Sequence, residues 1–214
     1  MSFTWIRRSV LRVALVPLVA MPLHAQRLGV VAGGTFSQLR GLDNVRAKNR
    51  TGTVFGLSLK LPMSDRVALQ PEVLFINKGS KLEFDNAGNS DIRLDYLEIP
   101  LLLRFDRSLS SALTPHFYLG PSLSYNVGCN VEVSTSPGAS SDCKRDVFFE
   151  PNDVDWGAVI GAGLDLNLGG LGVTGGARYG VGMANVSKDD GPALEQRVRN
   201  GTLTVYAGLL FGRR

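Results

Sequence analysis

LDYLEIPLLLRF, residues 94–105, is the segment whose side-chain pattern is most informative about the fold. It is densely apolar, yet Glu98 and Pro100 lie in its middle. A helix that crosses a bilayer needs about 20 apolar residues, and a proline inside a helix costs roughly 3 kcal/mol. An extended strand resolves the conflict, because it turns alternate side chains to opposite faces. One face then carries only apolar side chains: Leu97, Ile99, Leu101, Leu103 and Phe105. Glu98 and Arg104 lie on the other face.

The same period-two alternation recurs in segments of about 10 to 14 residues, the length of a tilted strand that crosses a membrane. In one of them, Phe55 and Leu57 share a face, and Ser58 and Lys60 share the opposite face. The 25 glycines of the chain also favour strands over helices. We expect eight strands joined in chain order. They span 27–37, 52–62, 66–79, 92–106, 115–128, 154–168, 171–184 and 201–212.

Two further features favour a membrane barrel over a soluble sandwich, which could show the same alternation. Aromatic residues lie near the strand ends, as in the interfacial girdles of membrane barrels. One set is Phe36, Phe55, Phe75, Tyr125 and Trp156, and the other is Phe105, Phe117 and Phe211. Short links also alternate with longer polar ones, as periplasmic turns alternate with external loops. We predict an all-β, eight-stranded antiparallel up-and-down transmembrane β-barrel with external loops at 38–51, 80–91, 129–153 and 185–200.

Residues 1–25 have the composition of a secretory signal peptide, so we assign 26–214 to the barrel domain. A basic start (Arg7, Arg8 and Arg12) precedes an apolar stretch and a small-residue ending. Removing these three arginines from the 23 basic residues leaves 20 against 19 acidic ones. The remaining chain is nearly neutral and has no basic stripe, so no nucleic-acid partner is expected.

Several segments together resemble the PorT-like outer-membrane β-barrel domain family. They are MSDRVALQPEVLFINKGSKLEF (63–84), LDYLEIPLLLRF (94–105), YLGPSLSY (118–125) and AGLDLNL (162–168). The resemblance covers residues 27–212. It implies an eight-stranded barrel in the outer membrane of a Gram-negative-type bacterium, usually without a defined molecular activity.

The candidates for chemistry are few, and we expect no catalytic, cofactor or metal site. His116, the one histidine after residue 25, is interpreted as an interfacial polar residue, so a hydrolase would lack its usual base. The acidic stretches 85–91 and 187–191 lack the ligand spacing of a calcium loop. The glycines of 157–170 and 175–182 imitate nucleotide-loop spacing, but no helix pattern follows. They are better explained as relief of crowding inside a small barrel.

The inward face of the predicted strands carries three acidic and three basic residues. They are Lys60, Glu72, Glu98, Arg104, Asp165 and Arg178. An eight-stranded barrel is just wide enough for side chains to fill it, so we expect a charge-compensated plug. In an exported chain, Cys129 and Cys143 are predicted to form a disulfide across the largest loop.

The function that we expect is therefore non-enzymatic. The barrel would be a monomer, surrounded by outer-membrane lipid and inserted by the barrel assembly machinery, with external loops for surface contacts or envelope support. Its surface or envelope partner is unidentified. Two alternatives stay open: a narrow porin-like conduit or small-ligand-binding barrel, and a hydrolase at the barrel rim.

Overall fold

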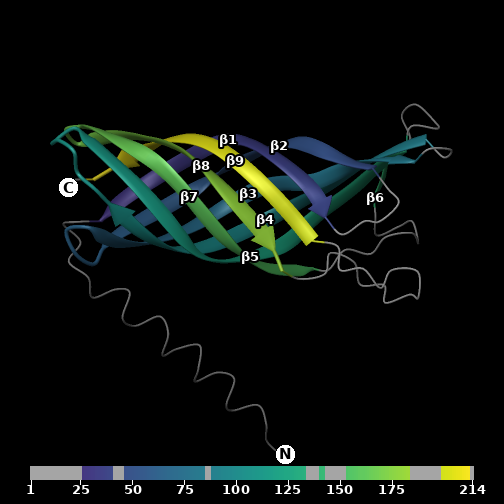
Figure 1. Cartoon of the computed structure of the whole chain (residues 1–214), viewed down its shortest axis with the longest axis horizontal. Helices are drawn as coiled ribbons and strands as arrows, with labels where there is room; N and C mark the ends of the chain where they lie inside the picture. Colours follow the sequence, from purple (N-terminus) through teal and green to yellow (C-terminus); the bar gives the residue numbers. More distant parts are fainter. Residues whose placement is uncertain are drawn as a thin grey trace, which may run out of the picture.

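A closed antiparallel sheet forms the fold, as the alternation predicts (Figure 1). The computed structural model describes residues 26–40, 46–84, 88–133, 140–142, 153–183 and 199–212. Within them, no helix is long and apolar enough to cross a membrane. Eight long strands each pair with their neighbours, and the β4–β5 pairing closes the ring. They are β1 (Arg27–Arg40), β2 (Arg46–Pro62), β3 (Val67–Phe84), β4 (Gly88–Asp106), β5 (Leu113–Val133), β7 (Val154–Leu168), β8 (Leu171–Gly182) and β9 (Arg199–Phe211).

Several strands are longer than the sequence predicts, and this corrects the loop boundaries. β3 and β4 remain paired from Gly79↔Arg93 to Phe84↔Gly88, so most of the expected loop 80–91 is a hairpin. A short strand, β6 (Ser140–Asp142), pairs with the end of β5 inside the expected loop 129–153. The reason is that backbone pairing needs no apolar alternation once strands leave the bilayer. Figure 1 shows these extensions projecting at the end opposite the C-terminus, called here the long-loop end.

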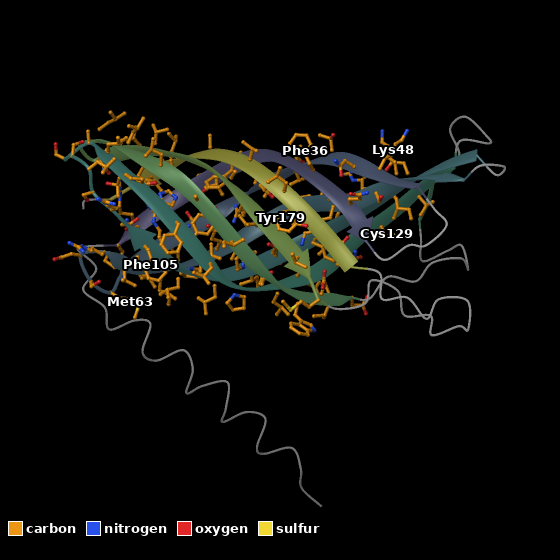
Figure 2. The ribbon with its side chains drawn as sticks, viewed as in Figure 1. Phe36, Lys48, Met63, Phe105, Cys129 and Tyr179 are labelled. Atoms are coloured by element: carbon orange, nitrogen blue, oxygen red, sulfur yellow. The ribbon has the colours of Figure 1, made fainter. Side chains whose placement is uncertain are left out.

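The outward side chains are apolar between two aromatic zones. Phe55 and Phe75 contact each other toward the long-loop end, with ring centroids 5.2 Å apart. Phe105 and Phe117 stack at 4.6 Å near the opposite end, called here the short-turn end. Figure 2 shows Phe36 and Phe105 far apart along the barrel axis. The outward apolar band is therefore bounded on both sides by aromatic rings, the arrangement that a bilayer requires.

Two register shifts lie in the half of the barrel nearer the long-loop end. One falls between Asn49 and Val54 of β2, and the other between Asp95 and Tyr96 where β4 pairs with β5. An extra residue reverses the inward and outward alternation beyond it. A proline lacks the donor for a ladder hydrogen bond, so the sequence predicts a local irregularity at Pro100. In the structure, the pairs on either side of Pro100 keep one register with both neighbouring strands.

Glycines on β7 and β8 make room for rings inside the barrel. A Cβ added at Gly161 would lie 2.6 Å from the ring of Tyr118, and one added at Gly163 would lie 2.6 Å from Nε2 of His116. Neither distance is sterically possible without displacement. The glycine-rich segments 157–170 and 175–182 therefore lie in paired strands and a tight turn, where they admit interior side chains.

Candidate functional site

The interior of the barrel is the candidate site, because charged side chains lie along it in three groups. The group nearest the short-turn end is built around Arg104. Its Nε donates to Asp106 at 2.7 Å, its Nη1 donates to Gln70 at 3.0 Å, and its Nη2 forms an ion pair with Asp165. Nζ of Lys60 lies 2.6 Å from the second carboxylate oxygen of Asp106. Two cations thus neutralise two carboxylates.

His116 joins this first group from β5, which corrects its interpretation as an interfacial residue. Its side chain is 0% exposed, and its Nδ1 lies 3.5 Å from Asp165. The inward parity of β5 places the ring there, and Gly163 leaves the space for it. Within the described part of the chain, no group of three His, Cys, Asp or Glu side chains is placed to hold a metal ion.

The second group crosses the middle of the barrel. Nη1 of Arg178 donates to Glu72 at 2.5 Å, and Gln70 donates to the other carboxylate oxygen of Glu72 at 2.7 Å. The Tyr118 hydroxyl donates to the Tyr206 hydroxyl at 3.0 Å, and the guanidinium of Arg178 lies 4.9 Å from the centre of the Tyr206 ring. An ion pair and two aromatic rings therefore fill this cross-section.

The third group, nearer the long-loop end, explains why Glu98 is tolerated in the stretch 94–105. Lys78 donates to Glu98 at 2.5 Å, and the hydroxyl of Ser124 donates to the same carboxylate oxygen at 3.2 Å. The Lys78 ammonium also lies 5.2 Å from the centre of the Tyr96 ring. A cavity of about 10 Å³ adjoins this group, which is room for about one water molecule.

All six residues of the predicted charge cluster lie in these three groups. Two further charged members of these groups, Lys78 and Asp106, were not predicted from the sequence. Lys78 shares the parity of Glu72 on one strand, and Asp106 shares that of Arg104 on another, so the signal was present. Each lies near the end of its predicted segment, where alternation is a weak guide.

Other predictions concern residues outside the described ranges. The signal peptide, 1–25, and the acidic stretch 187–191 lie wholly outside them. Cys129 is buried on β5, but Cys143 lies outside the described residues. The disulfide between them stays a prediction.

Comparisons with known proteins agree with the architecture. A model of the outer membrane protein beta-barrel domain matches residues 24–187. The solved structure of the outer membrane protein OprG from Pseudomonas aeruginosa is similar at 14% identity and a TM-score of 0.51, covering 89% of this chain and 98% of that one. Neisserial surface protein A has 19% identity and a TM-score of 0.49, covering 87% and 97%. The outer membrane enzyme PagL has 10% identity and a TM-score of 0.40, covering 86% and 99%. No curated protein matches the sequence significantly.

Proposed function

The chain belongs to the outer membrane protein β-barrel domain family and is a bacterial outer-membrane protein, and we propose that it is a non-enzymatic barrel with a closed lumen. The long-loop end would face outward and contact a partner at the cell surface or support the envelope. Membership of the PorT-like branch is part of the proposal and rests on the motifs in 63–84 and 94–105. We further propose that the barrel is a monomer inserted by the barrel assembly machinery.

The pair Glu72–Arg178 is the observation that carries the closed lumen. Glu72 lies on β3 and Arg178 on β8, which are four strands apart in either direction round the ring. Their 2.5 Å contact therefore spans the barrel from wall to wall. Buried charges are stable only when they are paired and hydrogen-bonded, and both partners here are about 5% exposed or less. An ion would have to displace this pair and the Tyr118–Tyr206 contact to pass.

A non-enzymatic role is supported by the location of His116. Its ring is enclosed in the barrel beside Asp165, at the short-turn end, where a lipid or peptide at the outer rim could not reach it. A hydrolase screen with a His116→Ala control tests this part of the proposal. Activity that disappears in that variant while the barrel stays folded would overturn it.

Single-channel recording tests the closed lumen. We expect purified protein in planar bilayers to show no reproducible unit conductance steps. The double variant Glu72→Ala and Arg178→Ala should show them, because it removes both charged groups from the central cross-section. As a matched control, Asp65→Ala with Arg66→Ala removes one exposed charge of each sign from a turn and should behave as the wild type. Stable steps from the wild type would instead favour the conduit.

Cysteine labelling of intact cells tests the orientation. Cys129 and Cys143 are first replaced by serine, and single cysteines are then introduced at exposed positions. Asn130→Cys should react with a membrane-impermeant reagent, whereas Ser64→Cys and Ser110→Cys in the short turns should react only after the outer membrane is opened. Strong labelling at position 64 or 110 in intact cells would show that the barrel is inserted the other way round.

A further inference from the structure

Two buried polar side chains of β9 face the small cavity beside the Lys78–Glu98 pair. Asn200 and Thr202 both line it, and they are 2% and 4% exposed. Within the part of the chain that the structure describes, neither the Thr202 hydroxyl nor either carboxamide atom of Asn200 has a hydrogen-bond partner. The Tyr96 hydroxyl approaches Asn200 without completing a hydrogen bond. Unpaired polar groups in an interior cost free energy, so an occupant that pairs with them would stabilise the barrel.

The cavity lies between opposite walls of the barrel. Thr202 is on β9 and Glu98 is on β4, and these strands are four apart in either direction round the ring. Gly180 of β8 also lines the cavity and leaves room there. A Cβ added at Gly180 would have a methyl group of Val159 as its nearest neighbour, at 3.9 Å. The volume of about 10 Å³ is close to the least that one water molecule needs.

The lining of the cavity selects the chemistry of its occupant. It contains the Lys78 ammonium as well as the carboxylates of Glu98 and Asp155. A bare cation would therefore face an ammonium group, and a bare anion would face carboxylates. An apolar occupant would leave the Thr202 hydroxyl unpaired. A water molecule both donates and accepts, and buried waters typically make about three hydrogen bonds to polar groups that have no other partner.

We propose that one water molecule binds in this cavity and joins Asn200 and Thr202 to the Lys78–Glu98 pair on the opposite wall. The third charged group is then completed by a bound water. The inference rests on the proposed closed lumen, because an open channel would hold exchanging water instead of one bound molecule. Its tests measure unfolding and electron density, whereas conductance tests the closed lumen, so either can fail without the other.

Replacing Thr202 with valine tests the water through the sign of the stability change. Valine keeps the shape of threonine and removes the hydroxyl. We expect the equilibrium constant for unfolding to rise roughly fivefold, because a bridging water contributes nearly as much as a direct hydrogen bond. Urea unfolding in lipid vesicles measures this change. If the hydroxyl had no partner, the variant would instead be as stable as the wild type or more stable, which would overturn the proposal.

Thr35→Val is the matched calibration for this variant. Thr35 is also fully buried, and its hydroxyl donates directly to the backbone carbonyl of Asn77 at 2.8 Å. Its loss should raise the unfolding constant by a similar factor. Heat-modifiable gel migration verifies that both variants are folded.

Gly180→Ala tests the same site by filling it. In a dry cavity the added methyl group would gain contacts and stabilise the barrel. If a water is bound, the methyl group displaces it, and the polar groups of Asn200 and Thr202 lose their partner. The matched control is Gly34→Ala, at an outward position where an added Cβ also has its nearest neighbour at 3.9 Å. We expect the unfolding constant of Gly180→Ala to exceed that of Gly34→Ala roughly fivefold. Equal stability of the two variants, or a more stable Gly180→Ala, would contradict the bound water.

A crystal structure of the full barrel, at a resolution that shows ordered waters, tests the occupant directly. With crystals grown in a rubidium salt, we expect one density peak within hydrogen-bond distance of the Thr202 hydroxyl and no rubidium anomalous signal there. The peak should disappear in Gly180→Ala. A rubidium signal at the peak would assign the site to a monovalent cation, and no peak in the wild type would remove the site altogether. Either result would overturn the proposal.

Discussion

Replacing Arg178 with methionine is expected to destabilise the folded barrel by about 3 to 5 kcal/mol, because it leaves the Glu72 carboxylate buried without its cation. Glu72 is 4% exposed, and besides its contact with Arg178 it accepts a hydrogen bond from the neutral amide of Gln70. Methionine keeps the unbranched apolar stem, so the contact with the Tyr206 ring is lost only in part. Reversible urea unfolding in lipid vesicles measures the change in free energy.

Two further variants show whether the loss of stability in Arg178→Met arises from the unpaired charge of Glu72. Glu72→Met alone should be comparably destabilising, since it leaves the Arg178 guanidinium buried without its carboxylate. The double variant should recover most of the loss, because replacing both partners of a buried ion pair by apolar groups is often neutral or stabilising. Arg107→Met, at an exposed position near a turn, controls for loss of an arginine and should change stability little. If the two single costs simply added in the double variant, the pair would not be coupled.

The fold could be predicted from the sequence because the bilayer imposes its own pattern. Every strand must carry apolar side chains on its outward face, because lipid covers that face and no other protein segment shields it. The β7 strand illustrates this: its predicted limits, 154–168, are those of the structure, and its burial alternates almost throughout. The same constraint made the parity of 94–105 unambiguous, with Leu101 exposed and Leu102 fully buried.

Strand ends and interior partners could not be predicted in the same way. Beyond the bilayer the constraint disappears, so the pairing of Lys81 with Asp91 and of Lys48 with Lys81 left no periodic signal. Inside the barrel, parity indicates which side chains point inward but not which ones meet. That Glu72 faces Arg178, 106 residues away, depends on the stagger of all strands in the closed ring. Lys78 and Asp106 were missed because they lie near the ends of their predicted segments, where the bilayer no longer imposes the alternation.

Leu101→Arg should be the most damaging change on the outer surface, costing about 2 to 4 kcal/mol, because it places a charge in hydrocarbon near the bilayer midplane. Leu101 is 46% exposed and lies midway between Leu97 and Phe105, which face the two aromatic zones. The matched control is Val127→Arg, a comparably exposed apolar position near the long-loop end, where the cost of arginine falls to about 0 to 1 kcal/mol. Folding yield into vesicles and urea unfolding report both values. Equal costs at positions 101 and 127 would mean that the outer face has no depth gradient and that the bilayer does not cross the barrel between the aromatic zones.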